Sequence, residues 1–390
     1  MTVDCVIVGG GAVGASLALA LAQLNYKVTL LEKNKPALPP EDFHARTLGL
    51  SYASHYIYDV LGIWDQLKNR AIPIQEVCVS VKGKFGSARL THLDHQAPAL
   101  GYVIGCSDLE SALYQQLAKS ENVHIYRGAE IAECFSYPDH WDLLITHNAN
   151  SEKITCRLLV AADGTTSHLR QAQGIPTQKI SYDHWAMISN VKIANFPKGV
   201  AVERFLKEGA IALLPWQQNF ATCVWTIKSE LKEALSALSP EEYMAECQKQ
   251  LGQRFGTIVE MGQRGCLSLD MILAIRQSSP RFLLLGNAAH SLHPIAAQGL
   301  NLSLRDIWQL RKQALKYQPN FGDLGNSEFL KEYLAARKCD QARVVFATDK
   351  MARFMSGGPL PSWLRALGVT LFDCLHPIKN KFTRYSMGLM

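Results

Sequence analysis

The fold is decided by a short glycine run, Gly9-Gly10-Gly11-Ala12-Val13-Gly14, which directly follows the apolar segment Val3–Val8. Residues 12–24 are rich in Ala and Leu, which is typical of a buried helix, and Lys27–Leu31 has the composition of a second strand. The run therefore fits the pattern G-x-G-x-x-G between a strand and a helix, within one compact βαβ unit.

Each glycine of this pattern has a physical reason. Gly9 permits a tight turn, Gly11 lets the backbone approach a pyrophosphate, and Gly14 lets the helix pack on the strand. The helix start offers unpaired N–H groups to phosphates, and Glu32 ends the second strand, where a carboxylate can accept from ribose hydroxyls. These residues predict a dinucleotide site, and the carboxylate favours a ribose without a 2′-phosphate. The pattern alone does not distinguish FAD from NAD.

Two later motifs follow further apolar strands. Residues 163–170 carry D-G-x-x-S-x-x-R after Leu158–Ala162, and residues 286–301 begin Gly-Asn-Ala-Ala-His after Phe282–Leu285. Segments with strand-like alternation, residues 74–90 and 185–227, interrupt these α/β parts. The order predicts a nucleotide-binding domain with a β-sheet lobe inserted into it.

In this order and at these separations, the three motifs resemble the FAD-dependent aromatic hydroxylases of the para-hydroxybenzoate hydroxylase type. Further stretches look like the ubiquinone-biosynthesis hydroxylases within that group, and the Asn287 variant is most similar to the 2-polyprenyl-6-methoxyphenol hydroxylase branch. These stretches are Glu203-Arg204-Phe205, Leu213-Leu214-Pro215, His293-Pro294-Ile295-Ala296, residues 298–302, Arg305-Asp306, Tyr333, Arg337 and Asp340.

The resemblance implies an α/β fold: a Rossmann-like FAD-binding domain with an inserted β-sheet substrate domain and a C-terminal helical segment. The FAD-binding domain is expected to be discontinuous, over residues 1–72, 101–180 and 266–330. The substrate domain is expected over residues 73–100 and 181–265, and the C-terminal helices over residues 331–390.

The resemblance also implies the site. Pro294 is a rigid residue suited to lie against a flavin face, Gly299 lets the backbone reach the ring edge, and Arg46 matches an arginine near the phosphates. The expected FAD ligands are Gly9, Gly11, Gly14, Glu32, Arg46, Asp163, Gly164, Gly286, Asn287, Pro294, Gln298, Gly299, Leu300 and Asn301. Residues expected near substrate are Arg204, Phe205, Leu214 and Pro215, with His293 and Pro294 as candidates for catalysis.

Two positions depart from the family pattern. Asn287 stands where most relatives have Asp, so it can bond a ribityl hydroxyl without carrying charge. Ala297 stands where Gly is usual, which restricts the flavin loop. For His290 and His293, a structural role in a packed loop competes with a role on a phenolic proton.

The implied reaction is hydroxylation of a polyprenylated phenol with NAD(P)H and O2, through a flavin C4a-hydroperoxide. The nicotinamide is expected to bind transiently, because the sequence has no second G-x-G-x-x-G. Three alternatives stay open or are disfavoured. Another flavin oxidoreductase and a non-catalytic scaffold subunit of a ubiquinone-biosynthesis complex stay open, whereas an NAD-linked dehydrogenase leaves the two later motifs unexplained.

Composition sets the remaining expectations. The 390 residues carry a formal net charge of +6 without a Lys/Arg block, which favours anionic partners and gives no support to nucleic-acid binding. None of the ten cysteines has C-x-x-C spacing, so no metal is expected, and the chain suits a reducing cytoplasm. Residues 360–390 mix apolar and basic residues, which fits either a peripheral contact with the inner membrane or helices packed on the core or a partner.

Overall fold

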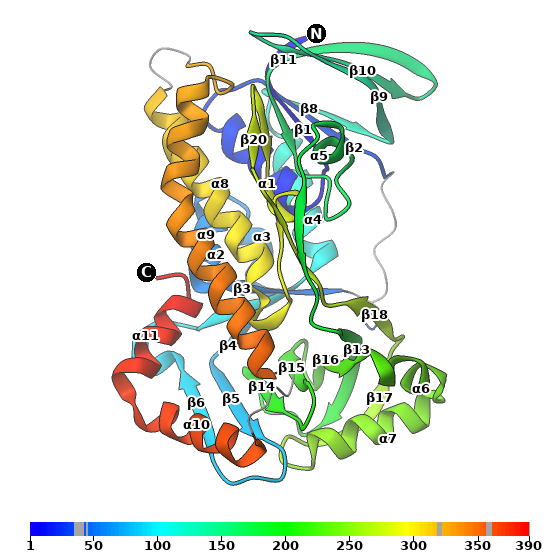
Figure 1. The fold of residues 1–390 in the computed structure, drawn as a ribbon, viewed down its shortest axis with the longest axis vertical. Helices are drawn as coiled ribbons and strands as arrows, with labels where there is room; N and C mark the ends of the chain where they lie inside the picture. Colours follow the sequence, from blue (N-terminus) through cyan, green and yellow to red (C-terminus); the bar gives the residue numbers. More distant parts are fainter. Residues whose placement is uncertain (35–42, 44–45, 318–321, 356–360, 390) are drawn as a thin grey trace.

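The computed structural model describes residues 1–34, 43, 46–317, 322–355 and 361–389, which form two lobes stacked along the longest axis (Figure 1). Within these residues, each lobe is built on one eight-stranded sheet. The lobes are joined by chain segments that cross between them several times, and by the long helix α9 (Ser327–Met355), which runs beside both (Figure 1).

The first lobe contains the predicted βαβ unit. β1 (Thr2–Val8) pairs in parallel with β2 (Val28–Glu32) and with β11 (Asn150–Ala161), and α1 (Ala12–Ala22) connects the first two. These strands are covered on both faces, which explains their unbroken apolar runs. The other strands of this sheet are β8 (Val123–Arg127), β9 (Ala129–Ser136), β10 (Trp141–His147), β20 (Ser278–Ser279) and β21 (Phe282–Leu284).

Helices cover this sheet. α1 packs against α4 (Cys106–Leu117) and α8 (Gln298–Tyr317), and α9 packs along α8. Apolar side chains of α1, α4 and α8 form one core with the faces of β1 and β2. Shorter elements beside them are α2 (Tyr52–Val60), α3 (Trp64–Leu67), α5 (His168–Ala172) and η4 (Gly286–Ala288).

The second lobe is a mostly antiparallel sheet in the order β17-β13-β16-β15-β14-β5-β6, with β18 also paired to β13. Helix α7 (Pro240–Leu251) covers one face, and its own Tyr243 and Cys247 pack into the core between helix and sheet. The strands are β5 (Glu76–Val81), β6 (Ser87–Thr91), β13 (His184–Ala194), β14 (Val200–Phe205), β15 (Ala210–Pro215), β16 (Phe220–Lys228), β17 (Thr257–Met261) and β18 (Gly265–Ser268).

Two three-stranded sheets lie between the main ones. One contains β3 (Thr47–Ser51), β7 (Gly101–Gly105) and β4 (Ile72–Ile74), and the other contains β12 (Thr177–Ile180), β19 (Met271–Ala274) and β22 (His290–Ser291). The last helices, α10 (Ser362–Cys374) and α11 (His376–Ser386), lie at the second lobe, where α10 packs on β5 and β6. The remaining elements are η2 (His92–His95), η3 (Ser229–Leu231), α6 (Lys232–Ala237) and η5 (Ile295–Ala297).

The mixed α/β fold with an inserted sheet and a C-terminal helical segment is confirmed. We propose the domain division expected above, with two adjustments. β18 pairs in the second sheet although it lies at the start of the segment assigned to the first lobe. The C-terminal helices do not act together, because α9 packs on α8 whereas α10 packs on the second sheet.

Candidate functional site

The first two motifs meet where parallel strands β1 and β11 end. Gly9 has φ +105, and a Cβ there would lie 2.4 Å from the carbonyl oxygen of Ala162 and 2.9 Å from the amide nitrogen of Asp163. Only glycine fits, because both the backbone angle and this close approach exclude a side chain. The glycine turn therefore lies directly against the Asp163-Gly164 turn.

The third motif reaches the same place through β21, which pairs in parallel with β11. Gly286 has φ +62, and a Cβ on it would lie 3.0 Å from Val13 at the start of α1. The buried guanidinium of Arg170 donates to the carbonyl oxygens of Ala288 (2.9 Å) and Thr165 (2.8 Å). These contacts hold the three turns together, although they lie more than 100 residues apart in the sequence.

The groups around these turns suit a dinucleotide. A Cβ at Gly11, Gly164 or Gly299 would meet nothing within 4 Å, so the backbone is open to a ligand at all three positions. Gly11 is the N-cap of α1 and no described side chain caps that helix, so its first amides suit phosphate oxygens. The Oδ1 atom of Asp163 is buried and accepts no hydrogen bond from any described residue. Amide donors and a carboxylate acceptor match the phosphates and hydroxyls of FAD.

Two predicted ligands have additional structural tasks. The carboxylate of Glu32 accepts from the amide nitrogens of Gly10 (2.6 Å) and Asn34 (2.8 Å), which holds the glycine turn against the end of β2. Each carboxylate oxygen of Glu32 keeps a free lone pair and can still accept a hydrogen bond from a ribose hydroxyl. That contact stays a prediction. The carbonyl oxygen of Arg46 accepts from Cys106 N (2.7 Å), which fixes the backbone at the start of α4, and the Arg46 side chain is exposed.

Asn287 and Pro294 point outward from otherwise covered segments. Asn287 is exposed whereas residues 282–286 and 288–290 are all buried, so its amide projects from the third turn. Pro294 is exposed as well, between the buried His293 and Ile295. Their roles in binding flavin stay predictions, but both side chains are accessible to a ligand.

The start of α8 is fixed by Asn301. Its Oδ1 accepts from Ser51 N (2.8 Å) and Ser54 Oγ (2.6 Å), and its Nδ2 donates to the carbonyl oxygens of Gly49 (3.1 Å) and Ala297 (2.7 Å). The Asn301 side chain is therefore not available to a ligand, because all four of its hydrogen-bonding positions are used within the protein, and Asn301 stays a predicted FAD ligand through its backbone.

The neighbours of Asn301 leave backbone contacts open. Leu300 packs its side chain against the core of the first lobe and Gln298 is buried, so any flavin contact of residues 298–301 is through amides at the helix start. Ala297 has φ +50, a left-handed conformation that an L-residue adopts only under strain.

His293 is a structural histidine in this fold. It is 3% exposed, its Nδ1 accepts from the amide of Ile295 (3.2 Å), and its ring lies edge-on to Tyr182. Burial, together with the nearby His184, lowers the pKa of His293 to about 4. At neutral pH its remaining ring nitrogen carries a hydrogen and can only donate. This geometry disfavours the predicted catalytic role as a proton acceptor.

His290 belongs to a buried ionic network. Its Nε2 lies 2.8 Å from Asp306 Oδ2, and Arg337 and Gln341 donate to the other oxygen of Asp306. Asp340 accepts from Arg337 and from Arg305, which extends the network to the surface.

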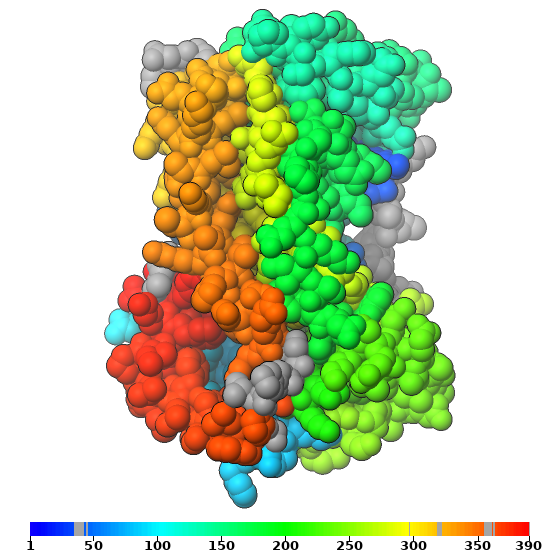
Figure 2. All heavy atoms as spheres, in the orientation of Figure 1, coloured from blue at the N-terminus to red at the C-terminus, as the bar shows by residue number. Residues whose placement is uncertain are grey.

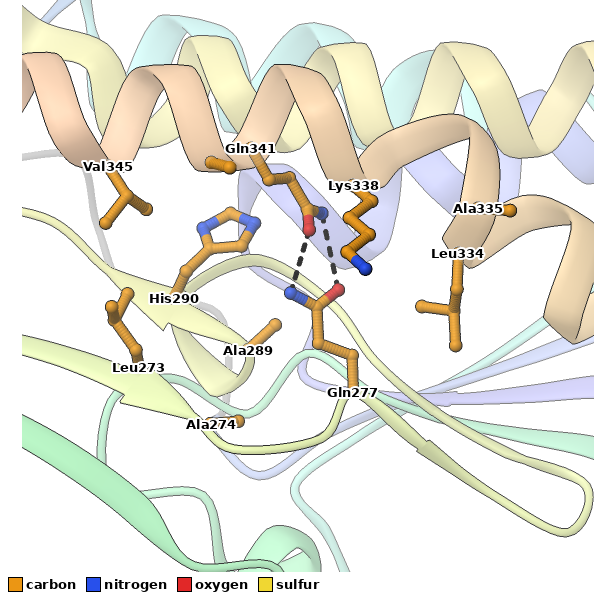
Figure 3. Close-up of a pocket in the computed structure, with 11 residues that line it drawn as sticks. Leu273, Ala274, Gln277, Ala289, His290, Leu334, Ala335, Lys338, Gln341 and Val345 are labelled. Atoms are coloured by element: carbon orange, nitrogen blue, oxygen red, sulfur yellow. Dashed lines mark hydrogen bonds between the residues drawn. The ribbon is translucent and has the colours of Figure 1, made fainter.

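A cavity of about 410 Å³ lies on the outer side of His290, between β19, β22 and α9 (Figure 3). Gln277 and Gln341 join across it through two hydrogen bonds, of 2.9 and 3.3 Å (Figure 3). The cavity lies beside the network and is lined by none of the residues predicted to bind FAD or substrate.

The predicted substrate residues divide between the two faces of the second sheet. Arg204 donates to the carbonyl oxygen of Leu251 (2.9 Å) at the end of α7, so the expectation that it lines the substrate face is corrected. Pro215 is two residues after Leu213 in β15, so both face the same side of the sheet, which is the side that α7 covers. Phe205 is on the opposite face, in a cluster that includes Ile295 of the flavin loop.

Leu214 and a residue not predicted lie on that same face. Leu214 is opposite Thr222, whose hydroxyl lies 2.7 Å from Thr47 Oγ1 in the first lobe. By strand alternation Glu203 also faces the first lobe. Glu203 was quoted in a sequence motif but was assigned no role. It stands two residues before Phe205 in a strand, so alternation would have placed both side chains on the same face.

Within the part of the chain that the structure describes, no group of three or more His, Cys, Asp and Glu side chains is arranged to hold a metal ion. Among the described helices, none has the length and apolar character needed to cross a bilayer.

Known proteins resemble this chain over almost all of its length. The family model described as FAD binding domain matches residues 2–345. Ubiquinone hydroxylase UbiL of Rhodospirillum rubrum is 31% identical over 99% of this chain and 90% of its own length. The 3-demethoxyubiquinol 3-hydroxylase of Escherichia coli is 29% identical over 99% of this chain and 98% of its own length.

Solved structures agree in fold. The p-nitrophenol 4-monooxygenase PnpA of Pseudomonas putida DLL-E4 superposes with a TM-score of 0.82 at 18% identity, covering 99% of this chain and 98% of its own. At this level of identity the likeness concerns the fold alone.

Proposed function

Since this chain belongs to the FAD binding domain family, and within it to the ubiquinone hydroxylases, we propose that it hydroxylates a polyprenylated phenol. The reaction is an FAD-dependent aromatic-ring monooxygenation in ubiquinone biosynthesis, with NAD(P)H and O2 as co-substrates. The expected substrate is of the 2-polyprenyl-6-methoxyphenol type. The observation that carries this proposal is the meeting of three distant turns around one open backbone surface.

The residues present fit FAD in a definite order. Gly11 and the α1 amides would hold the pyrophosphate, Glu32 and Arg46 the adenosine side, and Asp163 with Asn287 the ribityl chain. Pro294 and the backbone of Gly299 would border the ring. When bound, the flavin supplies acceptance of hydride from NAD(P)H and activation of O2.

The chain's own contribution is positioning and electrostatics. The first amides of α8 present the positive end of a 20-residue helix, which stabilises negative charge at the ring edge. The inner face of the second sheet, with Phe205 and Leu214, supplies an apolar wall that orients a phenol and excludes water.

Partners beyond the substrate are part of the proposal. Four apolar residues recur every four positions along α10 and at its C-cap, and they are 46–58% exposed: Trp363, Leu367, Leu371 and Leu375. We call these four residues the α10 ridge. Helices α10 and α11 form a continuous part of the second lobe's surface (Figure 2), and Lys381 and Arg384 are exposed on α11. An apolar ridge beside cations suits the headgroup region of an anionic membrane, where a polyprenyl substrate resides. Membership in a biosynthetic complex is compatible with the same surface.

Product analysis tests the function directly. The protein is loaded with FAD and given NADH or NADPH, O2 and a prenylated 2-methoxyphenol, and the gene is deleted in parallel. We expect a hydroxylated ring in vitro and an accumulated prenylated phenol in the deletion strain. Nicotinamide oxidation without a hydroxylated product would indicate another flavin oxidoreductase, and a protein that takes up no FAD would indicate a scaffold subunit.

A further inference from the structure

Glu203 is the acidic residue of β14 that faces the other lobe. Its neighbours across the sheet are Ala212 on β15 and Val79 on β5, which are both apolar. The adjacent Arg204 points to the opposite face, toward α7. The strand thus places one carboxyl between apolar neighbours on this wall.

This carboxyl has no partner among the residues that the structure describes. Glu203 makes no hydrogen bond or ion pair with any described residue, and its side chain is only partly buried. A carboxyl that is enclosed between two lobes normally acquires a partner, because an unpaired buried charge is costly. Its partial exposure means that open space adjoins it, and a ligand with a hydroxyl group would satisfy it there.

The surroundings connect this carboxyl to the flavin loop. Phe205, two residues along the same face, shares a hydrophobic cluster with Ile295, the residue after Pro294. Leu214 and Thr222 extend the same face toward β3. A phenol that lies over this wall therefore has the Glu203 carboxyl on one side and the expected flavin ring on the other.

We propose that Glu203 binds the phenolic hydroxyl of the substrate and accepts its proton as the ring is hydroxylated. This rests on the proposed function. The phenol O–H bond breaks, the proton forms an O–H bond on the carboxylate, and the electron pair stays on the phenolate oxygen. The ring becomes more electron-rich, which favours its attack on an electrophilic oxygen.

The acidity of the group suits this task. Burial raises the pKa of Glu203 to about 7. A phenol has a pKa of about 10, so a base with a pKa near 7 shares its proton much more readily than an ordinary glutamate does.

The charged groups on neighbouring elements make their hydrogen bonds and ion pairs away from Glu203. Asp349 and Arg353 on α9 pair with each other. Arg365 on α10 donates from Nη2 to the carbonyl oxygen of Lys207, and its buried Nε and Nη1 have no partner among the described residues. His293 of the flavin loop binds the Ile295 amide. On β5, Glu76 bonds to Cys78 on the α7 side.

The test compares Glu203→Gln with Glu260→Gln. Glu260 is exposed on β17 of the same sheet, so its substitution controls for the loss of a carboxylate. Binding of 6-geranyl-2-methoxyphenol and of its methyl ether is measured by equilibrium dialysis, which requires no turnover. Wild type and Glu260→Gln should bind the phenol about tenfold more tightly than the ether, and Glu203→Gln should lose most of this preference, because a neutral amide oxygen accepts a weaker hydrogen bond than a carboxylate does.

A second readout is the pH profile of kcat/KM for the same phenol. In the wild type, kcat/KM should rise with pH through about 7 as the carboxyl loses its proton, and this inflection should be absent in Glu203→Gln. An unchanged preference for the phenol, or an unchanged inflection, overturns the assignment of Glu203 even if hydroxylation proceeds. If the wild type yields no hydroxylated product, the proposed function fails. The dialysis measurement still tests whether Glu203 binds the phenolic hydroxyl, because it does not depend on turnover. If Glu203→Gln does not fold, equal binding of phenol and ether by the wild type overturns the assignment.

Discussion

His290 Nε2 and Asp306 Oδ2 lie 2.8 Å apart in the first lobe, where the two residues are 2% and 0% exposed. Burial alone would raise the pKa of Asp306, but the hydrogen bond from His290 and the charges of His290 and Arg337 outweigh it and hold that pKa below its ordinary value. The carboxylate joins β22, which follows the third turn, to α8 and α9. The network thus fixes the segment that leads into the flavin loop.

Substitution of Asp306 should be severely destabilising. Asp306→Asn leaves Arg337 buried without its main counter-charge, so we expect a loss of about 3–5 kcal/mol in the free energy of unfolding, measured with urea. Asp340→Asn is the control, because Asp340 binds the same arginine but is partly exposed, and its loss should be smaller. Because the folded pKa of Asp306 is lowered, its contribution is present above about pH 3.9 and is lost as pH falls below that value. Equal losses for the two variants would contradict a central role for Asp306.

Two glycines of the first turn should respond differently to alanine. A Cβ at Gly14 would lie 1.9 Å from the carbonyl oxygen of Gly9, whereas a Cβ at Gly11 would meet nothing within 4 Å. Gly14→Ala should therefore lower the thermal stability of the protein without ligand. Gly11→Ala should keep that stability but weaken FAD binding by about tenfold or more, because the methyl group occupies the approach of the pyrophosphate. Fluorescence titration with FAD and thermal unfolding separate the two outcomes, and normal FAD affinity in Gly11→Ala would place the cofactor elsewhere.

His293 should give the protein a stability that depends on pH. Burial lowers the pKa of His293 to about 4, so below the ordinary value of about 6.5 the unfolded chain binds a proton that the folded protein does not. Stability from this group is complete above pH 6.5 and declines as pH falls toward 4, by about 3 kcal/mol in total. Unfolding of the wild type and His293→Gln is compared at pH 7 and pH 4.5. The variant should lose less between the two values than His124→Gln, in which an exposed histidine is replaced; equal losses would show that His293 titrates normally.

The sequence predicted the parts of the site that are encoded locally. Strand, glycine turn and helix in residues 3–31 are specified by consecutive residues, and the structure has them within one or two positions. Gly9 was recognisable from the G-x-G-x-x-G pattern, and Gly286 from the third motif of the resembled family. The contacts that require glycine there, with Ala162 and with Val13, are distant in the chain, so the motifs and not the contacts made these two residues predictable.

What the sequence could not supply was the side of each element that faces the site. Arg204 and Glu203 are adjacent, and their opposite orientations depend on α7, about 40 residues later in the chain. The Asn301 side chain is likewise occupied by Ser51 and Ser54, which lie 250 and 247 residues away in the chain. Both arrangements depend on tertiary contacts that no local pattern contains.

Ala297 should be replaceable by glycine with a gain in stability. Its φ of +50 costs an L-residue about 1–2 kcal/mol, whereas glycine adds only about 0.5–1 kcal/mol of backbone entropy to the unfolded state. Ala297→Gly should thus raise the free energy of unfolding by about 0.5–1 kcal/mol and also ease FAD binding at the loop. In Ala245→Gly, on the exposed side of α7, the same exchange in a regular helix should instead lower it by about 1 kcal/mol. A loss at both positions would mean that the loop does not strain Ala297.

The α10 ridge should mediate binding to anionic lipid. The double variant Trp363→Ser and Leu371→Ser removes two exposed apolar side chains that do not hold the core, so the fold should be kept. Co-sedimentation with vesicles of phosphatidylglycerol and phosphatidylethanolamine should fall about tenfold or more relative to wild type. Phe135→Ser, at an exposed position on β9 in the other lobe, is the matched control and should bind as wild type does.

Lys381→Gln should weaken binding mainly at low salt, because the attraction of Lys381 to the lipid is screened as ionic strength rises. Unchanged sedimentation of the double variant would assign the ridge to a protein partner instead, and a stable complex with another protein would then be expected to cover Trp363.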